Sequence, residues 1–220
     1  MNHAAWTNLR LPSPYTVPEG AVMWGGGPGP GQGPRIAPGV YTVKVSSGSW
    51  TESQTFRVRT DPRYTPTMTD AEGAEQLRMA QEIGGEIKAL YDNLAKIRDT
   101  KKQAAEIAQK GGGAGSAVAA AANALKQKLE AVEGDITQMQ GEGGQDALNF
   151  PGRLDNQMIA LYQSIVAAER RMGTPVTERY KDLKPEADGV LKRAETALKV
   201  DVAAFNAVAT KNGMQAIIVK

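Results

Sequence analysis

Few residues in this chain could carry out chemistry. Histidine occurs once, as His3, and cysteine does not occur. A Ser-His-Asp triad or a histidine-based metal site would need a histidine held in the folded core, which a residue so near the end of the chain does not provide. The lack of cysteine excludes disulfides, cysteine-ligated zinc and thiol catalysis. We therefore expect no catalytic residues, no cofactor and no metal site, and we expect that the chain is not an enzyme.

Two further patterns look like binding motifs but lack the right context. Residues 25–33 read GGGPGPGQG, which superficially suggests a phosphate-binding loop. Such a loop needs a preceding strand, a following helix and donor N–H groups, and here prolines occupy several positions. Glu82 and Glu86 have helical spacing, but both lie beside the apolar positions, so a solvated helix face is the expectation.

The charge balance also excludes some classes of partner. The chain has 26 basic and 24 acidic residues, a formal net charge of +2. This gives no electrostatic reason to expect a nucleic acid. There is no apolar run of about 18 residues, so we expect no membrane insertion. The first residues lack the apolar region of a signal peptide, so an export signal would have to lie elsewhere.

Aromatic residues are concentrated in the first third. Trp6, Trp24 and Trp50 all lie there, together with Tyr15. Packing is the favoured interpretation. A carbohydrate platform is the alternative, although no pair of carboxylates is placed beside these rings.

The elements that would position these residues begin with a β-hairpin. After a region rich in Gly and Pro (residues 12–39), the sequence VYTVKV alternates apolar and polar residues, as a strand with one buried face does. SSGS supplies a turn in which Gly48 can adopt a positive φ, and WTESQTFRVR returns. Residues 4–11 form a further strand candidate.

From Thr69 onward the pattern becomes helical. Thr69 and Glu72 suggest a capping box at the start of a helix of roughly 40 residues. Breaks at residues 111–116 and 141–152 and a compact Gly-Thr-Pro junction at residues 173–175 separate three more helices. The apolar positions of the four helices are, in order, Ile83, Ile87, Leu90, Leu94 and Ile97; Val118, Ala122, Leu125, Leu129, Val132, Ile136 and Met139; Leu154, Met158, Leu161, Ile165, Ala168 and Met172; and Leu183, Ala187, Val190, Ala194, Leu198, Phe205 and Val208.

These elements predict a mainly α fold with a small β part. Four heptad-patterned helices form an antiparallel bundle, up-down-up-down, attached to a partial Ig-like β-sheet. The expected organisation is a β region (residues 1–66), a bundle (67–213) and an apolar extended tail (214–220). The middle helices would cover only the distal half, and the last helix would return the tail to the hairpin.

Two features strain the helical pattern. Gly84 and Gly85 lie inside the first helix, where each Gly costs about 1 kcal/mol relative to Ala. They indicate either a close approach by neighbouring backbone or a tolerated weakness. Pro185 lies inside the last helix, and because the apolar register continues past it, we favour a kinked, continuous helix over a break.

Several stretches resemble a known family. They read WTNLRLPSP, APGVYTVKV, FRVRTDPR, RLDNQMIALYQSIVAAERRMGTPVTERY and DVAAFNAVATKNGM. They are similar to the C-terminal portion of large bacterial sortilin-like, BNR-repeat "glycosyl hydrolase" proteins. In that family a β-propeller precedes a small Ig-like domain, similar to that of the flagellar hook-capping protein, and a helical segment follows.

The resemblance implies an extracytoplasmic, non-catalytic accessory module. The family's glycosidase or peptide-binding activity would reside in the propeller, which this sequence lacks. The first strands of the Ig-like domain are also missing, so the hairpin resembles half of a sandwich. We therefore expect a protein partner, or self-association, at the β end; a carbohydrate-binding or glycoside-hydrolase-associated domain is the alternative. The expected interaction surface comprises Trp6, Trp24, Tyr41, Trp50, Phe56, Ile217 and Ile218.

Overall fold

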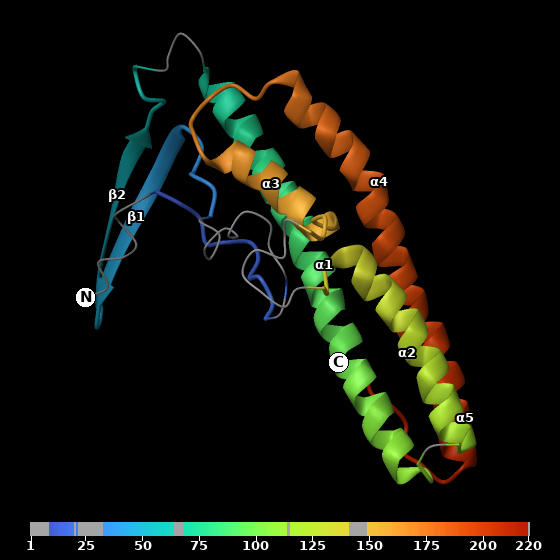
Figure 1. Ribbon diagram of the computed structural model, residues 1–220. Coiled ribbons are helices and arrows are strands. Elements are labelled where there is room, and N and C mark those ends of the chain that lie inside the picture. Colours follow the sequence, from blue (N-terminus) through green and yellow to red (C-terminus); the bar gives the residue numbers. More distant parts are fainter. Residues whose placement is uncertain are drawn as a thin grey trace.

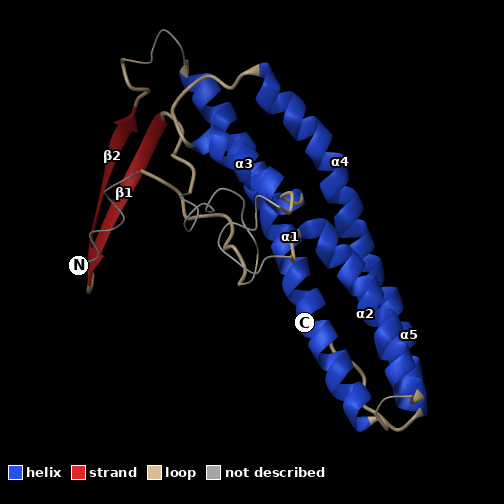
Figure 2. Cartoon of the chain, viewed as in Figure 1, coloured by secondary structure: helices blue, strands red, loops and turns tan. Residues whose placement is uncertain are grey.

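The computed structural model describes residues 9–19, 21, 33–63, 68–113, 115–140 and 149–219. A long helical bundle makes up most of the molecule, and a two-stranded sheet projects beside one end of it (Figures 1 and 2). The predicted fold class, mainly α with a small β part, is confirmed. The expected strand at residues 4–11 is described only from Leu9, and there Arg10 forms an isolated antiparallel bridge with Arg35.

The longest element is helix α1 (Asp70–Lys110). Its start is fixed by the predicted capping box, because the Thr69 hydroxyl accepts a hydrogen bond from the Glu72 N–H and the Glu72 carboxylate accepts one from the Thr69 N–H. One stripe of α1 is buried along nearly its whole length, including the fully buried Ile83, Leu94 and Ile97. The remaining helices pack against this stripe.

Helices α2 (Ala117–Ile136) and α3 (Leu154–Val166) run in the same direction, antiparallel to α1. As the chain advances through α2 and α3, the residues that they contact lie progressively closer to the start of α1. The contacts that show this are Gly111–Val118, Arg98–Glu133, Tyr91–Asp155 and Gln76–Ile165. The two short helices therefore cover successive halves of α1, and the expected up-down-up-down order is wrong.

The last leg of the bundle starts beside the hairpin end and runs away from it. Helix α4 (Thr174–Thr196), the π-helical turn η4 (Ala197–Asp201) and helix α5 (Val202–Lys211) follow one another without a break. Pro185 lies inside α4, so the predicted continuous helix is confirmed. Tyr180 contacts Glu82 near the start of α1, whereas Asp201 reaches Lys128 in α2. The bundle thus consists of three long helical segments: α1, then α2 and α3 placed end to end, and then the continuous run from α4 to α5 (Figure 1).

The apolar tail lies at the distal end of the bundle. Ile217 is buried, and Asn206 exchanges hydrogen bonds of 2.7 and 3.1 Å with the backbone of Ile217. Gln103 does the same for Ile218, at 3.0 and 3.1 Å. Gln103 is 26 residues along α1 from Leu77, which lies at the base of the hairpin, so the tail is about 40 Å along the bundle from that base. The expectation that the tail would reach the hairpin is wrong, because the last helix starts at the hairpin end rather than finishing there.

Gly84 allows the N-terminal segment to approach α1 closely. A Cβ at Gly84 would lie 2.4 Å from Cγ of Pro14, whereas a Cβ at Gly85 would meet nothing within 4 Å. The next residue, Tyr15, is buried and packs edge-on against Tyr162 at 5.4 Å between ring centroids. The close-approach interpretation therefore holds for Gly84, and Gly85 is the tolerated weakness.

The two glycines provide a matched pair of substitutions. Gly85→Ala is expected to raise the free energy of unfolding by about 1 kcal/mol, because alanine has the higher helix propensity and its methyl group finds open space. Gly84→Ala should lose this gain or destabilise the protein, since the Pro14 ring has to move. Chemical denaturation followed by circular dichroism measures both. Equal stabilisation by the two variants would contradict the close contact at Pro14.

Candidate interaction site on the β-hairpin

The larger apolar side chains of the hairpin lie on one face, which also carries Glu52 and Gln54. Strands β1 (Gly39–Ser47) and β2 (Trp50–Val58) pair antiparallel, with Tyr41 opposite Phe56. Because side chains alternate along each strand, this register places the larger apolar residues on the same face. We call these the apolar face; its members are Tyr41, Val43, Val45, Trp50, Phe56 and Val58.

Three of the six members of the apolar face are open to solvent. The side chains of Trp50, Val45 and Phe56 are 52, 44 and 37 % exposed. Tyr41 is half-buried: its ring stacks on Phe56 at 5.9 Å between centroids, and its hydroxyl donates to the Ala37 carbonyl. Solvated aromatic residues grouped on one face are typical of surfaces that bind a partner.

The outer edge of β2 is also open. Two residues, Gly48 and Ser49, link the strands, and φ is +60° at Gly48. A two-residue turn makes Ser47 and Trp50 a hydrogen-bonded pair, so from Trp50 onward every second residue of β2 directs its backbone groups toward β1. The residues between them, Thr51, Ser53, Thr55 and Arg57, direct their N–H and C=O groups outward. In the described sheet, no third strand pairs with them.

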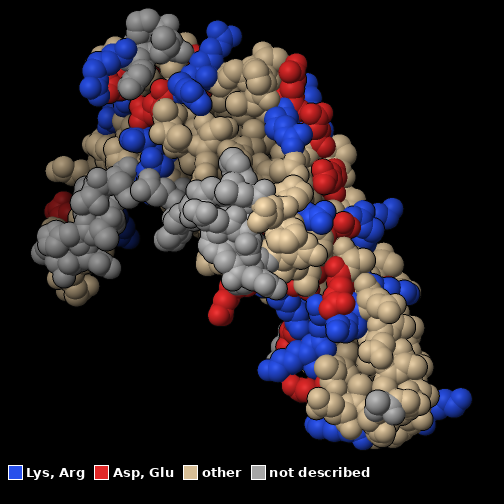
Figure 3. All heavy atoms as spheres, viewed as in Figure 1, with Lys and Arg blue, Asp and Glu red and all other residues tan. Residues whose placement is uncertain are grey.

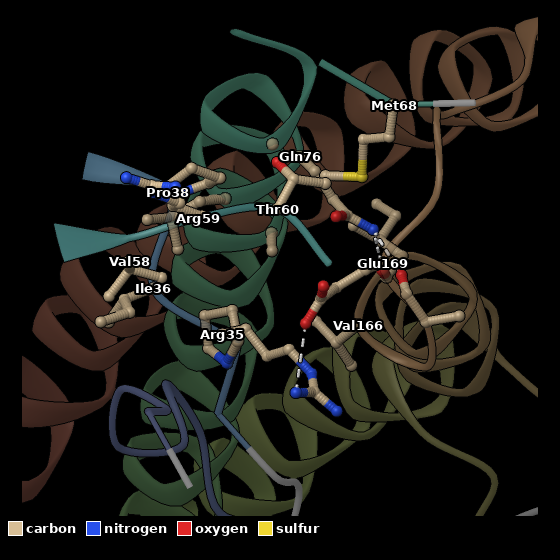
Figure 4. Close-up of a pocket in the computed structure, with 16 residues that line it drawn as sticks. Arg35, Ile36, Pro38, Val58, Arg59, Thr60, Met68, Gln76, Val166 and Glu169 are labelled. Carbon is tan, nitrogen blue, oxygen red and sulfur yellow. Dashed lines mark hydrogen bonds and ion pairs between the residues drawn. The ribbon is translucent and has the colours of Figure 1, made fainter. Parts of the chain in front are cut away.

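The base of the hairpin is mounted on the bundle around a cavity of about 50 Å³ (Figure 4). Ile36 and Val58 line its hairpin side, and Leu77 of α1 and Ile165 of α3 line its helical side. Beside the cavity, Arg35 and Glu169 form an ion pair of 3.2 Å between Nη1 and Oε1. Both side chains are partly exposed, so this ion pair contributes at most about 1 kcal/mol. The apolar contacts therefore do most to hold the hairpin in place.

The structure separates the residues that the sequence grouped into one surface. Tyr41, Trp50 and Phe56 share the apolar face. Ile217 and Ile218 lie at the distal end of the bundle, where Ile217 is a core residue, so they are not part of this site. Trp6 and Trp24 lie outside the described residues. The apolar contacts at the hairpin base had no sequence signal, because they join residues from three distant segments.

The acidic pair on α1 has partners across the bundle. The Tyr180 hydroxyl lies 3.0 Å from Oε1 of Glu82 and 2.9 Å from Oε1 of Glu86, and Lys184 pairs with Glu86 at 3.1 Å. The Glu86 side chain is only 13 % exposed. The expected solvated face is thus wrong for Glu86, because α4 packs over it. Burial, followed by the two carboxylates, raises the pKa of Tyr180.

Two buried acids join helices to one another. Glu133 of α2 is paired with Arg98 at 2.7 Å and Lys101 at 2.9 Å. Asp155 lies in the first turn of α3 and accepts hydrogen bonds from Asn156 and from the Tyr91 hydroxyl. Burial raises the pKa of Asp155, and these hydrogen bonds oppose the rise. Each acid is bound to a neighbouring helix, an arrangement that supports packing of the bundle.

Charges of both signs occur together on the face of the molecule shown in Figure 3. Within the described part of the chain, no group of three or more His, Asp or Glu residues is placed to hold a metal ion. None of the described helices is both long enough and apolar enough to cross a membrane.

Comparisons of this chain with family models, with curated proteins and with solved structures give no match.

The exposure of the apolar face can be tested by substitution. Trp50→Thr is expected to change the free energy of unfolding of the bundle by no more than about 0.5 kcal/mol, because the ring is exposed and far from the core. Leu129→Asp is the contrast: Leu129 is fully buried in α2, so this change removes apolar contacts and buries a charge. Thermal unfolding followed at 222 nm should show a sharply lower melting temperature only for Leu129→Asp. A comparable loss for Trp50→Thr would place the tip of the hairpin in the core.

Proposed function

We propose that this protein is a non-catalytic interaction module that binds its partner through the β-hairpin. One observation carries the proposal: an aromatic, largely apolar face and a strand edge with no partner among the described residues project together from a bundle with its own core. An isolated two-stranded hairpin is marginally stable in water, and three or more strands with a covered face are the usual stable form. The hairpin is therefore suited to be completed by another polypeptide.

The helical bundle acts as the support in this proposal. Helix α1 has 41 residues and so extends about 60 Å. Ion pairs between helices, such as Arg193–Asp135 and Lys128–Asp201, and the buried Glu133 join its legs along this length. A long body of this kind holds the hairpin at one end and can act as a spacer between two bound partners.

We place this module within a larger, exported, propeller-containing protein, acting by docking or oligomerisation. The support for this context is the similarity of residues 37–63 and 153–180 to the end of the propeller family, together with a described sheet of only two strands, fewer than an Ig-like sandwich has. In this context further strands of the larger protein, or its propeller, would cover the apolar face.

A carbohydrate-binding function is the second candidate, and one observation favours it. Trp50, Glu52 and Gln54 follow one another on the same face of β2, all exposed. An exposed indole beside a carboxylate and an amide can stack on a sugar ring and accept or donate hydrogen bonds to its hydroxyls. The row is open on all sides, whereas small-molecule sites are usually concave, so we rank this candidate second.

The fluorescence of Trp50 tests both candidates. In a variant with Trp6→Phe and Trp24→Phe, Trp50 is the remaining tryptophan. At nanomolar concentration its emission should be that of a solvated indole, and it should shift to shorter wavelength as protein concentration rises or when a propeller polypeptide of the similar family is added. Oligosaccharide titrations at constant protein concentration serve as the comparison.

The outcomes separate the candidates. A blue shift with added protein supports the interaction module, and a shift with oligosaccharide alone supports the carbohydrate function. An emission maximum that is already blue-shifted at nanomolar concentration and does not change with any addition would show that the hairpin face is covered within one chain. That result would contradict both candidates.

A further inference from the structure

We propose that the outer edge of β2 pairs antiparallel with the same edge of a second copy of this chain, centred on Ser53, to form a continuous four-stranded sheet. This inference rests on the proposed function and names the partner at that site. The observations that carry it are the openness of one particular edge and the self-complementarity of its residues.

Both strands are edges of the described two-stranded sheet, and β2 is the more exposed of the two. Every residue of β2 from Trp50 to Arg57 is exposed, whereas Tyr41 and Val43 of β1 are half-buried. The backbone just before β1 already has a neighbour, because Leu11 donates to the Pro34 carbonyl and Ile36 donates to the Leu9 carbonyl. Strand β2 has nine residues and contains no proline or bulge, and such a strand offers an unprotected edge to another strand.

Only some registers of the two β2 strands allow their outward N–H and C=O groups to form hydrogen bonds. We consider dimers in which a two-fold axis keeps the apolar faces of both copies on one side of the sheet. Each such register can be named by the sum of the numbers of two residues that lie opposite each other. This sum must be even, because the outward-directed residues of the two copies form the hydrogen-bonded pairs. A sum of 104 places Glu52 opposite Glu52 of the second copy, where the two carboxylates repel each other. A sum of 108 places Glu52 opposite Phe56 and leaves the carboxylate beside an aromatic ring.

A sum of 106 gives compatible pairs throughout. Ser53 lies opposite Ser53, and Thr51 lies opposite Thr55, so small and β-branched residues pair on the polar face. On the apolar face, Trp50 lies opposite Phe56, and Glu52 lies opposite Gln54, whose amide can donate to the carboxylate. No like charges face each other in this register.

This register also joins the aromatic residues of the two copies. Phe56 already stacks on Tyr41 of its own chain. Trp50 of the second copy would lie on the other side of Phe56, so that the two hairpins share one aromatic row at each end of the interface. Each bundle is attached at the Gly39 and Val58 end of its hairpin, and antiparallel pairing puts these ends at opposite sides of the new sheet. Figure 1 shows the bundle on the β1 side of the hairpin, running alongside it, so in this dimer the two bundles would flank the new sheet and run in opposite directions.

Cysteine cross-linking tests the pairing, because the natural chain has no cysteine. In the proposed dimer the two Ser53 Cα atoms are about 5.5 Å apart, within the span of a disulfide. Ser53→Cys under mild oxidation should form a covalent dimer at least tenfold faster than Ser46→Cys. Ser46 is the matched control, since it is an equally exposed serine on the same face but lies on β1.

A second pair of variants tests the register. Thr51→Cys and Thr55→Cys should each cross-link poorly alone, because the identical residues would be about 14 Å apart along the strands. A mixture of the two variants should form the covalent heterodimer. Sedimentation velocity of the wild-type chain at tens of micromolar should show the mass of two chains, falling to one in Ser53→Pro, which removes an outward N–H without removing a bond to β1.

Two results would overturn the inference. One is cross-linking of Ser53→Cys that is no faster than that of Ser46→Cys. The other is a wild-type chain that remains a monomer at all concentrations. If Trp50 emission nevertheless shifts when a propeller polypeptide is added, self-pairing fails while the proposed interaction module stands. If Trp50 emission responds to nothing, both fail.

Discussion

The structure depends on one continuous apolar stripe along α1. Every other helix finds its place by burying an apolar face against this stripe or against a helix that already covers it. The end-to-end arrangement of α2 and α3 follows from this constraint, because α1 is about as long as the two short helices together and an uncovered half would expose residues such as Ile83 and Leu90. The continuous leg from α4 to α5 then closes the core from the other side.

The two buried acids of the bundle are paired across helices, whereas the hairpin leaves its binding groups open to solvent. Glu133 and Asp155 are both almost fully buried, and each is bound by groups from a neighbouring helix. Such pairing is needed because an unpaired buried charge costs several kcal/mol. On the hairpin, apolar side chains and outward backbone groups both face solvent. This difference is the physical reason to assign the interaction to the hairpin and the support to the bundle.

The sequence predicted what depends on local pattern. The capping box at Thr69, the apolar positions of α1, those of α2 from Val118 to Ile136 and the turn at Gly48 follow from spacing and residue type, and all appear in the structure. Met139, predicted as a further apolar position of the second helix, lies beyond the end of α2 and is exposed. The direction of α3 could not be predicted, since an apolar heptad pattern is the same for a helix that runs parallel or antiparallel to its neighbour. For the same reason the position of the tail was predicted wrongly. The two tail residues Ile217 and Ile218 are held by Asn206 and Gln103, whose amides have no recognisable spacing in the sequence.

Native-state hydrogen exchange tests the central claim most directly, namely that the hairpin is an open element carried by an independently stable bundle. At concentrations low enough to keep the chain monomeric, the amides of α1 around Leu94 should exchange only through global unfolding. The outward amides of β2, such as Ser53 and Thr55, should exchange almost without protection, and the inward ones through local opening of the hairpin. Protection of the β2 amides equal to that of α1 in the monomer would contradict the account, because it would show that the hairpin is covered and is part of the same cooperative core.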